Sequence, residues 1–192
     1  MAKKKEKAII EFPSHAVELD IERILFNKRQ IFLFEKITHR SALSVIKQIK
    51  ALDALSREPI ILWINSYGGN CDAGLAIIDA MKHAKSPIAT WITGTACSMA
   101  SLISIAGNAR IMNTNAVWMI HPTTSGVADY VSIVEDRVKG MKLWQTTKKK
   151  LLTKYTKLRK KELEKALRGE LWLDSKQCLK KGIVDKVIKH RR

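Results

Sequence analysis

Cysteine is scarce in this chain, and the few cysteines lie far apart. The three are Cys71, Cys97 and Cys178, and no two of them form a CxxC pair. This spacing gives neither a disulfide framework nor a zinc site, so no metal site is expected. Reduced thiols in a cytoplasmic protein are the simplest interpretation.

Long apolar segments are also lacking. Only Ala8, Ile9 and Ile10 separate the basic N-terminus from Glu11, which is too short for the apolar core of a signal peptide. The uncharged stretch 88–107 contains three Thr, three Ser and two Gly, which makes it too polar for a transmembrane helix. We therefore expect no membrane segment.

Acidic residues are few, since 18 Asp and Glu stand against 35 Lys and Arg, for a net charge of +17. Residues 137–161 contain eleven Lys or Arg and no Asp or Glu. Basic blocks often bind nucleic acid. This block lacks the regular aromatic residues of a single-strand-binding platform, so the solvated face of a long helix is favoured and a nucleic-acid partner is not expected.

What remains is the composition of one globular domain, with 192 residues of which 46% are hydrophobic. We find no internal repeat and no low-complexity linker. A single domain over residues 1–192 is expected, and residues 1–18 are predicted to be a flexible basic segment.

Apolar runs and helical periodicity predict the elements. Continuous apolar runs predict strands at 31–34, 59–64, 88–92, 117–120 and 183–187. Helices are predicted at 40–56, 72–84, 98–107, 161–168 and 175–181. Strands without alternation, separated by amphipathic helices, predict an α/β fold with a parallel sheet buried on both faces.

A long helix over about 127–160 is predicted by one apolar stripe. Its residues are Val127, Val131, Val134, Val138 and Met141. The stripe weakens near Gln145 and returns at Leu152 and Tyr155. A helix of this kind, basic on its outside, could project from the domain and pack on another subunit.

Three chemically useful features follow predicted parallel strands. Gly68 and Gly69 follow 59–64, Ser98 follows 88–92, and His121 follows 117–120. The carboxyl ends of parallel strands share one edge of a sheet, where ligands bind. Ser98 could attack a carbonyl and His121 could move its proton, while backbone N–H groups hold the oxyanion.

Each feature also has a structural interpretation. A serine at a helix start is usually a cap, a histidine after a strand is usually packed, and a Gly-Gly pair is usually only a turn. The combination is far more specific than any one part.

Four segments together resemble the family of the Clp protease proteolytic subunit, ClpP. They are residues 64–69, 96–100, 119–121 and 182–185. Their sequences are similar to that family's Asn-Ser-Pro-Gly-Gly, Ala-Ala-Ser-Met-Gly/Ala, Met-Ile-His and Gly-Leu-Val-Asp motifs. The similarity runs in order from about residue 20 to residue 187.

This resemblance implies a ClpP/crotonase-like α/β fold of parallel-strand βαβ units, with 127–160 as a protruding handle helix. It implies a cytoplasmic serine endopeptidase with Ser98 as nucleophile, His121 as base, and Gly69 and Met99 as oxyanion donors. Such a subunit serves an ATP-dependent Clp protease that degrades unfolded polypeptides in a closed chamber. The family forms heptameric rings stacked in pairs, a tetradecamer. A partner AAA+ unfoldase uses the ATP, and no cofactor is expected in the chain itself.

The resemblance offers two candidates for the third member of the catalytic triad. Aligning back from residues 182–185 puts Glu170 where the family usually has Asp, with Asp174 as the alternative. Tyr67 replaces a proline of the family's oxyanion turn. Cys97 replaces a small residue beside the nucleophile, and we expect it to be packed rather than reactive.

Two other classes of function stay open. The chain could be a ClpP-like paralogue with altered or lost activity, although it retains both Ser98 and His121. It could also be another crotonase-fold enzyme, either an acyl-CoA enzyme with carboxylates in its pocket or a peptidase with a Ser–Lys dyad.

Overall fold

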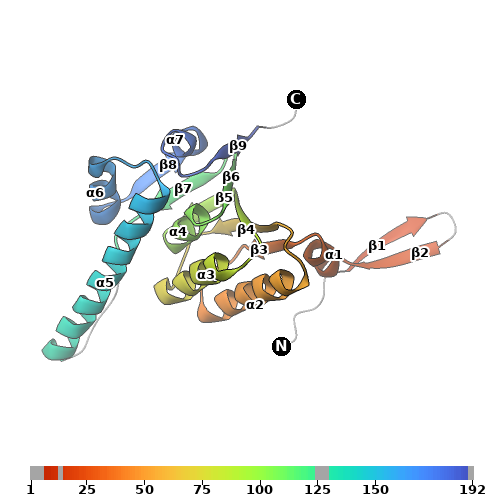
Figure 1. Cartoon of the computed structure of the whole chain (residues 1–192), viewed down its shortest axis with the longest axis horizontal. Coiled ribbons are helices and arrows are strands. Elements are labelled where there is room, and N and C mark those ends of the chain that lie inside the picture. The colour runs from red at the N-terminus through yellow and green to blue at the C-terminus, as the bar shows by residue number, and fades with distance from the viewer. Residues whose placement is uncertain (1–6, 13–14, 124–129, 190–192) are drawn as a thin grey trace.

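The computed structural model describes residues 7–12, 15–123 and 130–189, with side chains from residue 20 onward. A mixed sheet with helices on one face forms the body, and an N-terminal hairpin projects from it (Figure 1). In chain order the elements are β1 (Lys7–Phe12), β2 (His15–Asp20), α1 (Ile21–Asn27), β3 (Gln30–Leu33), α2 (His39–Leu55), β4 (Ile60–Ser66), α3 (Cys71–His83), β5 (Ile88–Cys97), α4 (Met99–Ile105), β6 (Ala109–Asn113), β7 (Val117–Ile120), α5 (Val131–Tyr155), α6 (Lys160–Arg168), β8 (Leu171–Asp174), α7 (Ser175–Lys180) and β9 (Lys186–Ile188).

The main sheet has the strand order β3-β4-β5-β6-β9, and all neighbours along this path are parallel. The long strand β5 pairs with β6 through residues 89–92 and with β7 through residues 95–97. Strand β8 then pairs with β7 in the antiparallel direction. The predicted parallel βαβ architecture is confirmed for every strand of this sheet except β8.

A local irregularity lets β5 change partner. The register between β4 and β5 shifts after Ile64, and the Asn65 side chain accepts a hydrogen bond from the Thr95 N–H at 3.0 Å. A Cβ on Gly94 would lie 2.6 Å from the Asn65 Oδ1, so only glycine leaves room for this amide. The second half of β5 is thereby directed toward β7, and it carries Ser98 at its end.

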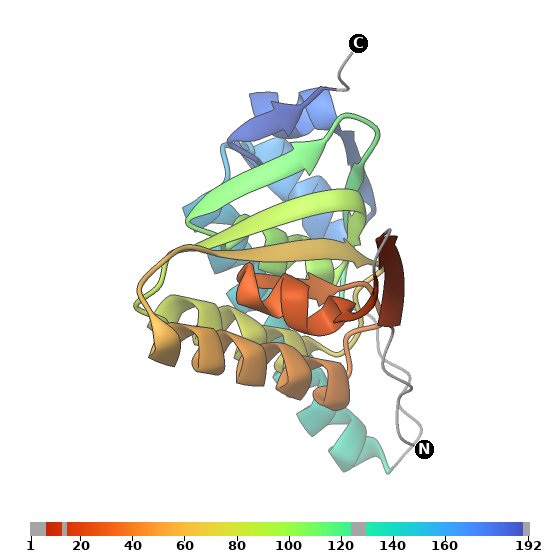
Figure 2. The ribbon, with the colours of Figure 1, turned by 90° about the vertical axis from the view of Figure 1, so that its right-hand side faces the viewer.

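Helices α2, α3 and α4 pack against one face of the sheet (Figures 1 and 2). Ile60, Leu62 and Ile64 of β4 point to this side and are fully buried, while the residues between them are only partly buried. The prediction of a sheet buried on both faces is therefore wrong for the described part of the chain. The described residues leave the side chains of the second face only partly buried.

Large aromatic rings occupy that second face. Phe32 of β3, Trp63 of β4 and Trp91 of β5 stack in a row, with centroid distances of 6.2 Å and 4.4 Å. Phe32 is 40% exposed. Because these rings alternate with core residues along each strand, the strands are continuously apolar in sequence. Aromatic residues suit a half-buried sheet surface as well as a core, so this pattern does not require that both faces be buried.

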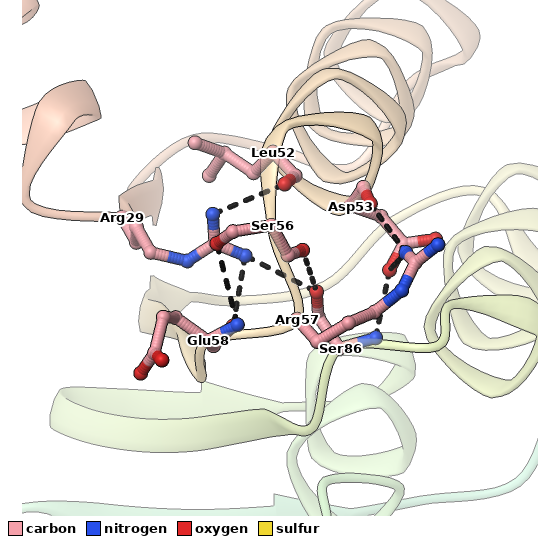
Figure 3. Close-up of polar contacts among 7 residues, drawn as sticks. All are labelled: Arg29, Leu52, Asp53, Ser56, Arg57, Glu58 and Ser86. Atoms are coloured by element: carbon pink, nitrogen blue, oxygen red, sulfur yellow. Dashed lines mark hydrogen bonds and ion pairs between the residues drawn. The ribbon is translucent and has the colours of Figure 1, made fainter.

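Arg29 fastens the end of α2 to the beginning of β4 (Figure 3). Its guanidinium donates hydrogen bonds to the backbone carbonyls of Leu52 and Glu58 and to the hydroxyl of Ser86. The Ser86 N–H in turn donates to the Asp53 carboxylate at 2.7 Å, and this bond is the main reason that the pKa of Asp53 falls to about 2. The C-terminal end of α2 is therefore hydrogen-bonded to Arg29 and Ser86, which are distant from it in sequence.

The N-terminal segment differs from its prediction. Within the segment expected to be flexible, β1 and β2 pair in an antiparallel hairpin, which ends where α1 begins. The β-branched and aromatic residues among 7–12 and 15–20 favour such pairing. Residues 1–6 and 13–14 lie outside the described residues.

The predicted long helix is observed as α5, which extends away from the body (Figure 1). It ends at Tyr155 rather than near 160, because the next residues turn and the Lys157 N–H donates to the Lys181 carbonyl. Residues 127–129 of the predicted helix lie outside the described residues. None of the described helices is both long enough and apolar enough to cross a membrane.

Other boundaries moved by a few residues. The last strand is Lys186–Ile188 rather than 183–187, because Ile183 and Val184 are buried in the turn after α7. Strands β6 and β8 and helix α1 were not predicted. The other predicted helices and strands are observed, with their ends shifted by one to a few residues and β5 extended to Cys97.

Candidate active site

Ser98 lies in a strained turn between β5 and α4. Its backbone has φ 54° and ψ −121°, and only Arg29 shares a positive φ among the described residues other than glycine. The Ser98 N–H donates to the Met119 carbonyl at 2.8 Å, which ties the turn to β7. The Ser98 hydroxyl makes no capping hydrogen bond. The capping interpretation of this serine is therefore wrong, and its hydroxyl is available for chemistry.

Gly68 and Gly69 form the turn that lies against Ser98. Both have positive φ, 93° and 151°. A Cβ on Gly68 would lie 2.8 Å from the Ser98 Cβ and 2.9 Å from the Met99 nitrogen. Backbone bonds from the Ile37 N–H to the Gly68 carbonyl and from the Asn70 N–H to the Ile37 carbonyl hold this turn in place. The two loops that the sequence predicted to act together are therefore in direct contact.

Two backbone N–H groups next to Ser98 have no protein acceptor. Within the described residues, neither the Gly69 nor the Met99 N–H donates a hydrogen bond to the protein. Met99 is the first residue of α4, so its N–H has no intrahelical partner. Unpaired N–H groups beside a nucleophile can stabilise a developing oxyanion.

These residues line one small cavity with His121. The cavity has a volume of about 60 Å³, and its wall includes Gly69, Cys71, Ser98, Met99, His121 and Lys148. We call it the Ser98 cavity. His121 comes directly after β7 and is half-buried, and its backbone carbonyl accepts a hydrogen bond from the Lys148 Nζ at 2.7 Å. Within the described residues, no direct hydrogen bond joins the Ser98 hydroxyl to the His121 ring.

Glu170 lies directly before β8, and Asp174 is the last residue of β8. The antiparallel ladder ends with the pair of Ile120 and Leu171, so His121 and Glu170 are the next residues of the two chains beyond that pair. The Glu170 carboxylate is exposed and accepts a hydrogen bond from the Trp172 indole N–H at 2.8 Å, not from His121.

Asp174 has a different role in the structure. It pairs with Val117 at the far end of β7, and its carboxylate caps α7 by accepting from the Gln177 N–H at 2.7 Å. The register therefore favours Glu170 over Asp174 as the partner of His121. Cys97 is fully buried, as expected for a packed side chain. Burial is the main cause that raises the pKa of its thiol, and the nearby Glu170 carboxylate adds a smaller increase.

Lys148 is the residue that the sequence analysis missed. Ten of the eleven basic residues over 137–161 are exposed, as expected for a solvated helix face, but Lys148 is 7% exposed and lines the Ser98 cavity. The signal was present, since Lys148 continues the apolar stripe of α5 at a spacing of seven residues from Met141 and four before Leu152. Charge alone does not distinguish a lysine at a core position of a helix from a lysine on its solvated face.

The described residues favour neither a metal site nor the site of an acyl-CoA enzyme. Within them, no cluster of three or more His, Cys, Asp or Glu side chains could hold a metal ion. The acid/base groups in the wall of the Ser98 cavity are Cys71, His121 and Lys148, and the wall contains no carboxylate. An acyl-CoA enzyme of the crotonase type, which needs acid/base carboxylates in its pocket, is not favoured by this composition.

Comparison with known proteins shows the family of this chain. The family model for Clp protease matches residues 14–191. The chain is 33% identical over 176 residues to the ATP-dependent Clp protease proteolytic subunit of Streptococcus mutans, covering 89% of this chain and 90% of the relative. It is 31% identical over 180 residues to proteolytic subunit 1 of Chlamydia muridarum (91% and 93%) and 30% identical over 169 residues to proteolytic subunit 2 of Treponema denticola (86% and 84%). The chain belongs to the Clp protease family.

Proposed function

We propose that this chain is a serine endopeptidase, the proteolytic subunit of an ATP-dependent Clp-type protease. The observation that carries the proposal is the Ser98 turn, whose uncapped hydroxyl lies beside two N–H groups without protein acceptors and shares a cavity with His121. Family membership and the names of the relatives support the same assignment.

The proposed reaction is acyl transfer in two steps. The Ser98 Oγ attacks the carbonyl carbon of a peptide bond, and His121 takes the hydroxyl proton and passes it to the leaving amine. The N–H groups of Gly69 and Met99 hold the negatively charged oxygen of the intermediate. Water, activated by His121, then releases the acyl group and restores Ser98. These side chains and amides supply every group in the proposal, so it requires no cofactor in the chain.

We assign Glu170 as the orienting carboxylate. It would accept a hydrogen bond from the Nδ1–H of His121 and stabilise the imidazolium that forms during the reaction. To do so, the carboxylate must turn from the Trp172 indole toward His121, which follows β7 where Glu170 precedes β8. The flexible glutamate side chain permits this rotation without moving the strand.

The assembly follows from the same assignment. The relatives are named as proteolytic subunits of ATP-dependent Clp proteases, which supports an ATP-using AAA+ unfoldase as partner of this chain. We propose that the chain forms heptameric rings stacked in pairs in the cytoplasm and degrades unfolded polypeptides there. Mass photometry of the purified protein tests the assembly, because a particle of 21.7 kDa would contradict it.

A fluorophosphonate probe tests the chemistry directly. An activated serine oxygen displaces fluoride from the probe, so the wild-type chain should be labelled at Ser98 and Ser98→Ala should not. Ser44→Ala, at an exposed position of α2, is the matched control and should be labelled like wild type. Equal labelling of Ser98→Ala and wild type would remove Ser98 as the nucleophile.

Cleavage of short fluorogenic peptides tests the base. His121→Ala should lose peptide cleavage by about 10²–10⁴-fold, which is the usual contribution of a positioned general base. A Ser–Lys peptidase would tolerate this change, so full activity in His121→Ala would overturn the proposed role of His121.

A further inference from the structure

Lys148 is the one charged side chain that the described part of the chain buries. It belongs to α5, yet its ammonium group reaches back to the His121 carbonyl. Its neighbours in sequence, Lys149 and Lys150, are exposed. A buried ammonium group is unfavourable unless something compensates its charge.

The protein offers this ammonium group little compensation. Its one hydrogen bond among the described residues goes to a neutral carbonyl, although an ammonium group has three N–H donors. No carboxylate lines the Ser98 cavity, and the facing titratable groups are the Cys71 thiol and the His121 ring. Burial lowers the pKa of Lys148 to about 8, and the interaction with Cys71 offsets only part of that effect. Two Nζ–H donors of the Lys148 ammonium group are thus left to bind a polar group that enters the cavity.

The Ser98 cavity adjoins the position of the substrate residue whose carbonyl is cleaved. A scissile carbonyl bonded to the Ser98 Oγ, with its oxygen at the Gly69 and Met99 N–H groups, has its own Cα one bond away. The side chain on that Cα is thus next to the Ser98 cavity, whose wall includes Met99, Leu102 and Lys148. A volume of about 60 Å³ holds a few water-sized groups, which suits a short side chain.

We propose that Lys148 makes this cavity select substrates with an acidic side chain, Asp or Glu, at the residue whose carbonyl is cleaved. The inference rests on the proposed function. The carboxylate would accept hydrogen bonds from the two remaining Nζ–H donors and neutralise the buried charge. A neutral side chain of the same size would leave the ammonium group unpaired, so the enzyme discriminates against it.

The other possible role of Lys148 is that of general base in a Ser–Lys dyad. Within the described residues its Nζ donates to the His121 carbonyl and makes no hydrogen bond to the Ser98 hydroxyl, which a base in this dyad would need. The two roles give opposite results for removal of the amine. A specificity residue changes which peptides are cleaved, whereas a base is needed for all of them.

The experiment compares short fluorogenic peptides that differ only in the residue before the cleaved bond, which is Asp, Asn, Leu or Lys. We expect the full-length assembled protein to show a kcat/KM at least tenfold higher for Asp than for Asn. Lys148→Met should lose that ratio and gain activity on Leu, and Lys148→Glu should prefer Lys. Lys149→Met, one position along α5 on its exposed side, should leave the ratio unchanged.

Probe labelling separates this inference from the proposed function. If the fluorophosphonate fails to label Ser98 in wild type, the proposed function fails. If wild type and Lys148→Met are both labelled but wild type cleaves Asp and Asn peptides equally, only the role of Lys148 is refuted. Loss of both labelling and all cleavage in Lys148→Met would also refute it, since Lys148 would then act on Ser98 rather than on substrate choice.

Discussion

Gly68→Ala is the sharpest test of how the two loops build the site. The added Cβ would lie 2.6 Å from the Cys97 carbonyl oxygen, 2.8 Å from the Ser98 Cβ and 2.9 Å from the Met99 nitrogen. Two of these three atoms are backbone, so they cannot move without the Ser98 turn. The positive φ of 93° adds about 1–2 kcal/mol of strain, and overpacking adds about 1–3 kcal/mol. We expect a loss of about 2–5 kcal/mol in the free energy of unfolding.

The loss of activity should exceed what this instability explains. A displacement of about 1 Å in catalytic groups costs about 100-fold in rate. The readouts are urea denaturation at fixed protomer concentration and the second-order rate of fluorophosphonate labelling in the absence of urea. Gly140→Ala is the control, because its Cβ would meet nothing within 4 Å in the middle of α5. The free energy of unfolding of that variant should be about 0.5–1 kcal/mol higher than that of wild type, and its Ser98 should be labelled at the wild-type rate. A wild-type labelling rate in folded Gly68→Ala would refute the argued contact between the loops.

Three further predictions follow from single contacts. Glu170→Ala should lower kcat/KM on peptides by about 10²–10⁴-fold, whereas Asp174→Ala should keep activity and lose about 1 kcal/mol of stability as a lost helix cap. The Asp53 carboxyl has a folded pKa of about 2 against 3.8, so its stabilisation is present above pH 4 and is lost as the pH falls toward 2. Asp53→Asn should remove that part of the acid dependence of the thermal midpoint, and an unchanged dependence would contradict the bond to Ser86. For Lys148, the pKa falls from 10.5 to about 8, so the unfolded chain binds more protons between these values and stability rises with pH there. Lys148→Met should lack this rise. Below pH 8, its free energy of unfolding should exceed that of wild type by up to about 3 kcal/mol because no buried charge remains. The His121 carbonyl, left without its donor, should offset about 1–3 kcal/mol of that gain.

Much of the site could be predicted because it depends on short-range order. The apolar runs before Gly68, Ser98 and His121 each form a parallel strand, and parallel strands bring their ends to one edge. Ser98 stands where a predicted strand is followed by a predicted helix, and the structure shows a turn there. Long-range contacts then complete the site, such as the bond from the Ser98 N–H to the Met119 carbonyl.

What the sequence could not give depends on contacts between distant residues. Strand β8 has only four residues and is specified by its pairing with β7, so neither periodicity nor length marked it. Strand β6 carries the charged Arg110, which is paired with Asp185, a residue far away in the sequence. The buried position of Lys148 follows from where α5 meets the Ser98 cavity.

The aromatic row on the sheet has a consequence for spectroscopy. The Trp63 and Trp91 rings lie 4.4 Å apart with an angle of 24° between their planes, close enough for their electronic transitions to couple. We expect a paired circular dichroism band of opposite signs that disappears in Trp91→Phe. Because these rings lie on the face away from α2, α3 and α4, the band would change whenever another molecule covers that face. The protein thus carries an intrinsic optical reporter of its own associations.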